Sequence, residues 1–135
     1  MTEQSGSSDV LPQFDAVAAF GVIESCSDAL LDRVDFGVIG FDQSGNVRRY
    51  NSTESRLAGL AQSAVLDRHL FDVVAPCMNN FMVAQQFEDA LAHGRDIDTL
   101  VDYVLTLRMR PQRVKLRLLA QHDVATRYIL VQRHL

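Results

Sequence analysis

The sequence predicts an α+β fold, with one five-stranded antiparallel sheet, helices on one side of it and a helical cap at the N-terminus. Three observations lead to this prediction. Two short apolar segments flank a turn-rich stretch near residue 44, the longest helical pattern follows in the middle of the chain, and three strand-like segments close it. Strands that are grouped together, separated from the helices and joined by polar turns are typical of an antiparallel sheet.

The N-terminal segment predicts a polar lead followed by a helical cap. Residues 1–12 are polar and rich in Gly and Ser, which is typical of a disordered lead. Residues 14–34 have a broken helical pattern, in which Gly21 is expected to interrupt one helix and Ser27 to cap a short second one. The segment is interpreted as a cap packed over the sheet, and a dimer contact is the competing interpretation.

A hairpin and two short helices are expected next. Residues 36–41 and 47–50 predict two strands, and the Asp, Ser, Gly and Asn residues between them favour a hairpin turn. Asn51 predicts the cap of a helix over 52–57, because its side chain can accept a hydrogen bond from a free amide of the first turn. Residues 62–66 suggest a further helical turn.

The second half of the chain predicts a long helix and the rest of the sheet. Apolar residues from Phe81 onward fall on one face at helical spacing, which predicts a helix from residue 80 or 81 to 92. His93 and Gly94 form its expected stop. Three further strands are predicted over 100–109, 114–118 and 128–131. We expect residues 1–30 to form the lead and cap, and residues 31–135 to form one globular domain.

Composition excludes several functional classes. The chain of 135 residues has a net charge of −4, which argues against nucleic acid as a main partner. No apolar run is long enough to span a membrane, and the N-terminus lacks the pattern of a secretory signal, so a cytoplasmic protein without membrane contact is expected. The two cysteines, Cys26 and Cys77, are too few for a disulfide framework, and no metal-binding spacing is present.

The most informative stretch is Val73-Val74-Ala75-Pro76-Cys77. Pro76 fixes its own φ and disfavours the helical region for Ala75, so the chain is expected to arrive extended and then turn. Cys77 would follow near the start of the next helix, where free amide groups favour a thiolate. A buried structural thiol is the simpler alternative.

Several motifs occur with this stretch between about Leu31 and Val131. They are Phe36-Gly37, Asp42 through Asn46, Tyr50-Asn51 with Glu54, Val74-Ala75-Pro76-Cys77, and Met109 followed by Pro111. Together they resemble the photoactive yellow protein family, the small bacterial blue-light photoreceptors with a PAS fold. A general PAS domain would share the fold but has no reason to combine Tyr50, Glu54 and the Ala-Pro-Cys corner.

The resemblance implies a covalent chromophore and a site for it. In the family, p-coumaric acid (4-hydroxycinnamic acid) is held as a thioester, a role that falls here on Cys77. Tyr50 and Glu54 would then donate hydrogen bonds to the buried phenolate, for which Glu54 must be protonated. Light-driven isomerisation and proton transfer from Glu54 would leave an unpaired buried carboxylate and loosen the N-terminal cap.

The resemblance also implies the lining of the chromophore pocket, where this chain departs from the family. Ala58 replaces a threonine that bonds the tyrosine, and Leu60 replaces an arginine at the pocket mouth. Aliphatic residues replace aromatic ones at Leu70, Leu105 and Leu107. The implied chromophore-binding residues are Tyr50, Glu54, Ala58, Leu60, Phe71, Pro76, Tyr103, Leu105 and Met109, with Met109 matching a methionine that assists recovery.

Two other functions are compatible with the sequence. The losses at Ala58 and Leu60 favour a PAS module that binds a ligand without a covalent bond, or binds a protein partner. An enzyme with Cys77 as nucleophile ranks last, because only His69 lies near it in sequence as a base. The main interpretation is a non-enzymatic sensor, a monomer or weak dimer through the cap, which signals to an unknown downstream protein.

Overall fold

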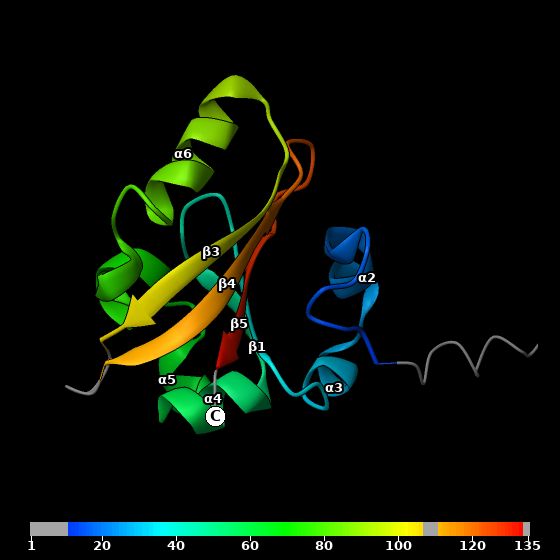
Figure 1. Ribbon diagram of the computed structural model, residues 1–135, viewed down its shortest axis with the longest axis vertical. Coiled ribbons are helices and arrows are strands. Elements are labelled where there is room, and N and C mark those ends of the chain that lie inside the picture. The colour runs from blue at the N-terminus through cyan, green and yellow to red at the C-terminus, as the bar shows by residue number, and fades with distance from the viewer. Residues whose placement is uncertain (1–10, 107–110, 134–135) are drawn as a thin grey trace, which may run out of the picture.

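A single antiparallel sheet organises the protein, which we describe from a computed structural model covering residues 11–106 and 111–133. The strands lie in the order β2-β1-β5-β4-β3 (Figure 1). They are β1 (Gly37–Phe41), β2 (Val47–Tyr50), β3 (Ile97–Leu105), β4 (Gln112–Ala120) and β5 (Arg127–Arg133). The first strand therefore pairs with the last, which brings the hairpin beside the end of the chain. The predicted fold class is confirmed.

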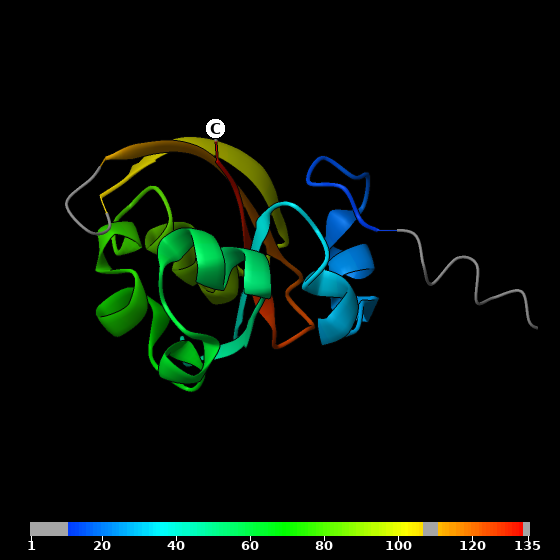
Figure 2. The same ribbon diagram turned by 90° about the horizontal axis from the view of Figure 1, so that it is seen from below.

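Helices cover the two faces of the sheet unequally. In the part of the chain that the structure describes, one group of helical segments lies on the face that the curved sheet partly encloses, and a smaller group lies on the opposite face (Figure 2). The first group is α4 (Ser52–Ala58), α5 (Gln62–Val65), the π-helical turn η1 (Leu70–Val74), the 3₁₀ turn η2 (Pro76–Met78) and α6 (Ala84–His93). The second group, which we call the cap, is α2 (Ala19–Ser25) and α3 (Asp28–Leu31).

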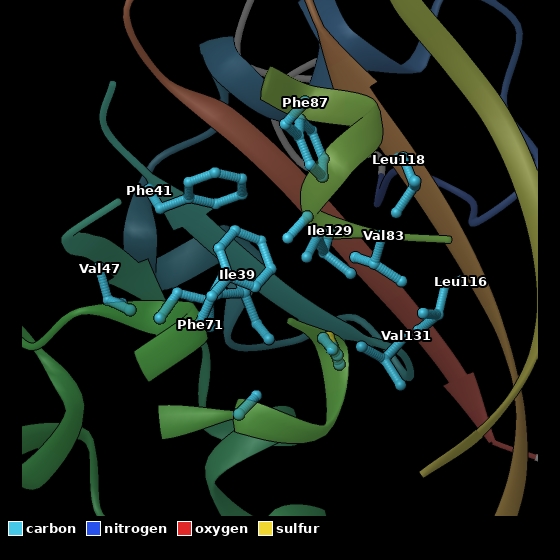
Figure 3. Packing of buried hydrophobic residues seen from close by; sticks show 14 of the residues in the cluster. Ile39, Phe41, Val47, Phe71, Val83, Phe87, Leu116, Leu118, Ile129 and Val131 are labelled. Atoms are coloured by element: carbon cyan, nitrogen blue, oxygen red, sulfur yellow. The ribbon is translucent and has the colours of Figure 1, made fainter. Parts of the chain in front are cut away.

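The larger core lies between the sheet and the first group of helices (Figure 3). Phe41 of β1 meets Phe71 of η1 and Phe87 of α6 edge to face, with ring centroids 5.5 and 4.9 Å apart. Such pairs add to the burial of their apolar area by about 0.5–1.5 kcal/mol each. From β5, Ile129 and Val131 face the same core. This packing fixes η1, and with it the approach to Cys77.

The cap packs on the outer face of the sheet through apolar contacts and two arginines. Phe20 of α2 meets Tyr128 of β5 edge to face at 5.8 Å. Arg49 of β2 donates hydrogen bonds to the Cys26 carbonyl and the Tyr128 hydroxyl. Arg117 of β4 donates to the carbonyl oxygens of Phe14 and Ala16, each at 2.8 Å. The predicted packing of the cap over the sheet is confirmed, whereas the dimer contact stays a prediction.

We expect Arg117→Met to loosen the cap without unfolding the domain. Hydrogen bonds to charged groups contribute about 1.5–3 kcal/mol, so losing those to Phe14 and Ala16 should speed amide exchange in 14–25 by about tenfold or more. Lys115→Met is the matched control, because Lys115 lies on the same strand and face and pairs only with Asp102, at 4.0 Å. Equal exchange rates in the two variants would remove Arg117 from this role.

Local signals predict helix ends well. Asn51 caps α4 by accepting a hydrogen bond from the Glu54 amide at 3.0 Å, as expected. Gly94 ends α6 with φ of 62°, a left-handed conformation that favours glycine. Ser27 caps α3 as expected, by accepting a hydrogen bond from the Leu30 amide at 3.1 Å.

Two helix predictions are wrong. Gly21 lies inside α2 rather than interrupting a helix, and a Cβ there would meet nothing within 4 Å. A single glycine costs a helix only about 1 kcal/mol, which the packing of Phe20 and Ile23 offsets. Helix α6 begins at Ala84, not at residue 80 or 81, and Phe81 is 79% exposed.

Candidate functional site

The corner that carries Cys77 is helical on both sides of Ala75. Residues 70–74 form the π-helical turn η1, in which the Ala75 amide donates to the Leu70 carbonyl at 2.7 Å. The expected extended arrival is therefore wrong: the wide turn satisfies backbone groups that an extended chain would leave to other partners. Ala75 itself has φ of −137° and ψ of 67°, as the steric effect of Pro76 predicts.

The backbone of Cys77 is fixed by two side chains. The Tyr103 hydroxyl and the Asn80 side-chain amide both donate hydrogen bonds to its carbonyl oxygen. Cys77 lies in the three-residue turn η2, and the next α-helix starts only at Ala84. The expected position near the start of a longer helix is therefore wrong. Cys77 is half-buried and packs against the larger core.

Tyr50 and Glu54 lie on either side of the junction between β2 and α4. Tyr50 is the last residue of β2, and Glu54 lies in the first turn of α4, as the Asn51 cap predicts. Their residues are 5% and 2% exposed. Burial raises the pKa of the Tyr50 hydroxyl, and the nearby Glu54 carboxyl raises it further, while Arg133 opposes both. The two side chains therefore share one buried environment.

Arg133 is the partner of Glu54, and the sequence motifs do not point to it. Its Nη1 and Nη2 donate hydrogen bonds to Glu54 Oε1 and Oε2 at 2.7 and 3.0 Å. Both side chains are almost fully buried, with 2% and 3% of their surface exposed. Burial raises the pKa of the Glu54 carboxyl, and the bonds from Arg133 oppose that rise. The net direction is a raised pKa, which is the condition that the predicted protonated donor requires, and the role of Glu54 as a donor to a ligand stays a prediction.

Strand periodicity could have identified Arg133. Ile129 and Val131 face the larger core, so a period of two places Arg127 and Arg133 on the same face of β5. Arg127 is also buried, with 7% of its surface exposed. Because a buried charge is costly without a partner, each of these two arginines needs a polar or charged partner inside the protein. For Arg133 that partner is Glu54.

A glycine makes room for this pair. A Cβ on Gly37 of β1 would lie 2.0 Å from Glu54 Oε1, closer than any real contact. Asn51 holds the same junction, since its side chain accepts from the Val38 amide and donates to the carbonyls of Leu31 and Phe36. The carboxyl group therefore occupies a space defined by β1, α4 and the end of β5.

The other predicted chromophore-binding residues divide into three groups. Phe71 and Leu105 are buried in the larger core with Tyr50, and Leu60 and Tyr103 pack against it with Cys77. Ala58 is buried and Pro76 is exposed. Leu107 and Met109 lie outside the described residues. A cavity of about 800 Å³ opens beside the anchors of Cys77 and is lined by Asn80, Met82, Asp102, Tyr103, Val104, Arg113 and Val114.

The part of the chain that the structure describes contains neither a metal-binding cluster nor a membrane-spanning helix. Within residues 11–106 and 111–133, no three His, Cys, Asp or Glu residues are grouped as a metal site would require. In the same ranges, no helix has the length and apolar character needed to span a bilayer.

Comparisons with known proteins agree with this geometry. The PAS fold family matches residues 31–132. The photoactive yellow protein of Rhodothalassium salexigens is 31% identical over 91 residues, which are 67% of this chain and 72% of that protein. That of Halochromatium salexigens is 31% identical over 96 residues, 71% of this chain and 76% of that protein.

A solved structure extends the comparison to three dimensions. The photoactive yellow protein domain of the sensor histidine kinase Ppr from Rhodospirillum centenum superimposes with a TM-score of 0.76 at 34% identity. The match covers 84% of this chain and 98% of that domain. The similarity therefore includes both the sequence and the arrangement of the elements.

Proposed function

The chain belongs to the photoactive yellow protein family of PAS domains, and from this premise we propose that it is a light sensor carrying p-coumaric acid as a thioester on Cys77. One observation carries the proposal. Cys77, whose carbonyl oxygen accepts two side-chain hydrogen bonds, packs against the same core that contains the buried Tyr50. The buried carboxyl of Glu54 lies in the first turn of the helix that follows Tyr50.

The residues present fit an aromatic acid. Tyr50 offers a buried phenolic O–H that can donate a hydrogen bond to the oxygen of a ligand. Phe71, Leu105 and Val131 supply an apolar surface. The half-buried Cys77 thiol is the only cysteine on this face, since Cys26 lies with the cap. When bound, p-coumaric acid supplies light absorption and an isomerisable double bond.

The protein's own part is to hold this group and to respond when it changes shape. Cys77 forms the thioester, and Tyr50 donates a hydrogen bond to the phenolic oxygen. Leu105 and Val131 exclude water from the site. We propose that strain in this core reaches the cap through the sheet, because β5 contacts both: Ile129 and Val131 face the core, and Tyr128 and Leu130 face the cap. A loosened cap would then be the surface read by a downstream protein.

Attachment is tested by adding activated p-coumarate to the purified protein. The Cys77 sulfur attacks the activated carbonyl, the activating group leaves, and one p-coumaroyl group replaces the thiol proton. We expect a single mass addition that Cys77→Ser abolishes and Cys26→Ser retains, with an absorption band shifted from that of the free acid. Labelling that persists in Cys77→Ser, or an unchanged spectrum, would contradict the proposal.

A PAS module without a covalent chromophore is the second candidate. It is favoured by Leu60, which offers no charge near the site, and by Arg133, which already satisfies Glu54 without any ligand. The intact mass of protein purified from its native host separates the two candidates. An added p-coumaroyl mass favours the light sensor, and an unmodified mass favours the module.

A further inference from the structure

Arg127 is the second buried arginine on the core face of β5, and it has no partner of the kind that Arg133 has. Only 7% of its surface is exposed. In the part of the chain that the structure describes, its guanidinium takes part in no hydrogen bond or ion pair, and the one charge that acts on its pKa is Asp42. A buried cation left in this state is costly, so its position needs a reason.

The carboxylate of Asp42 is already bonded to other groups. Its Oδ1 accepts hydrogen bonds from the amides of Ser44 and Asn46, each at 3.0 Å, and its Oδ2 accepts one from Arg48 Nε at 2.9 Å. These bonds hold the hairpin turn between β1 and β2, so Asp42 attracts Arg127 without bonding it. Within the described residues, the five N–H groups of Arg127 are therefore left without an acceptor.

These N–H groups reach a cavity. Every fully buried side-chain nitrogen or oxygen atom of the described residues has a hydrogen-bond partner. The unbonded nitrogen atoms of Arg127 must therefore reach open space, and Arg127 lines a cavity of about 290 Å³ between the hairpin turn, η1 and α6. Phe41, Phe71 and Phe87 also line it, and Figure 3 shows their rings beside one another. A buried cation thus lies next to an apolar wall.

The outer part of the cavity carries the opposite charge. Asp72 and Glu88 both line it, and both are exposed, the Asp72 side chain to 66%. With Asp42 they place three carboxylates around one guanidinium, so a simple anion meets repulsion on its way in. A ligand that carries a carboxylate and an ammonium group would instead find a partner for each charge.

The walls of the cavity are fixed before any ligand arrives. The Leu70 amide of η1 donates a hydrogen bond to the Gly45 carbonyl of the hairpin turn at 2.8 Å. A Cβ on Gly45 would collide with the ring of His69, so the turn packs directly against the start of η1. A preformed site binds with a smaller loss of conformational freedom, and a volume of about 290 Å³ suits a small molecule.

We propose that this cavity binds a small aliphatic α-amino acid. Its carboxylate pairs with Arg127, its ammonium group faces Asp72 and Glu88, and its side chain packs on the phenylalanine wall. The inference does not rest on the proposed pigment, and the full chain without pigment is used to test it.

Isothermal titration calorimetry with four probes tests the class of ligand. L-valine carries both charges, isovalerate lacks the amine, isobutylamine lacks the carboxylate, and inorganic phosphate is a simple anion. L-valine should bind at least tenfold more tightly than each of the other three, as the loss of charged hydrogen bonds predicts. Isovalerate or phosphate binding as tightly would reduce the cavity to an anion site, and no binding of L-valine up to about 10 mM would overturn the proposal.

Three variants test the residues. Arg127→Met should weaken the binding of L-valine at least tenfold, and Glu88→Gln should weaken it by about two- to fivefold, because Glu88 is exposed. Asp89→Asn is the matched control, since Asp89 is the next residue of α6 and accepts a hydrogen bond from Gln85 instead. It should bind L-valine as the unchanged chain does. Equal binding by the unchanged chain and Arg127→Met would overturn the proposal.

A measurement without ligand separates a binding role of Arg127 from a structural one. Arg127→Met removes a buried charge and breaks no hydrogen bond, so it should unfold at the same urea concentration as the unchanged chain or at a higher one. Arg133→Met, on the same face of β5, breaks a buried pair and should unfold at a lower concentration. An equal loss of stability in the two variants would show that Arg127 serves the fold, and would overturn the proposal.

Discussion

Replacing Arg133 with methionine should lower the free energy of unfolding of the pigment-free protein by about 3–5 kcal/mol at pH 7.5. The loss is large because Glu54 would stay buried, with 2% of its residue surface exposed, after losing both of its charged hydrogen bonds. Urea denaturation followed by circular dichroism measures it. The double variant Glu54→Gln with Arg133→Met should recover most of the stability, since it leaves no unpaired charge.

The pH dependence of the single variant gives an internal check. Burial raises the pKa of Glu54 in the folded state, and Arg133→Met removes the group that opposes that rise. A group with a raised folded pKa stabilises the protein below its unfolded pKa and loses that effect as pH rises through the folded value. Arg133→Met should therefore regain stability as pH falls from 7.5 toward 5. A penalty that stays constant over this range would show that Glu54 is not the cause.

Where the sequence predicts this structure correctly, the determinant is local. Asn51, Ser27 and Gly94 end or begin helices through backbone groups within a few residues of themselves, so their effect can be read without knowing the fold. The strands follow in the same way from short apolar segments between turn residues. The Ala-Pro-Cys motif then places Cys77 in a turn that precedes helix α6.

The failures have long-range or competing causes. Arg133 and Glu54 are 79 positions apart, and no local pattern joins them. Helix α6 starts late because the Asn80 side chain accepts hydrogen bonds from the amides of Met82 and Val83, which closes a turn before the helix. The π-helical approach to Cys77 depends on the packing of Phe71 against Phe41 and Phe87, which periodicity alone does not show.

Gly37→Ala should affect the site as severely as the loss of Arg133. The added Cβ would lie 2.0 Å from Glu54 Oε1 and 2.9 Å from its Cδ, so the carboxyl group must move. Gly37 pairs with Val131 in the centre of the sheet, which prevents the strand from yielding instead. Overpacking costs about 1–3 kcal/mol, and a displaced Glu54 adds the cost of a broken buried pair.

Gly21→Ala is the control for this substitution, because a Cβ there meets nothing within 4 Å and lies in helix α2. It should stabilise the protein by up to about 1 kcal/mol through helix propensity. Gly37→Ala should instead lower the free energy of unfolding by about 2–5 kcal/mol, measured by the same urea titration. Equal stabilities for the two variants would mean that the Glu54 side chain can adopt another buried position. Its contact with Arg133 would then be one of several arrangements of the pair.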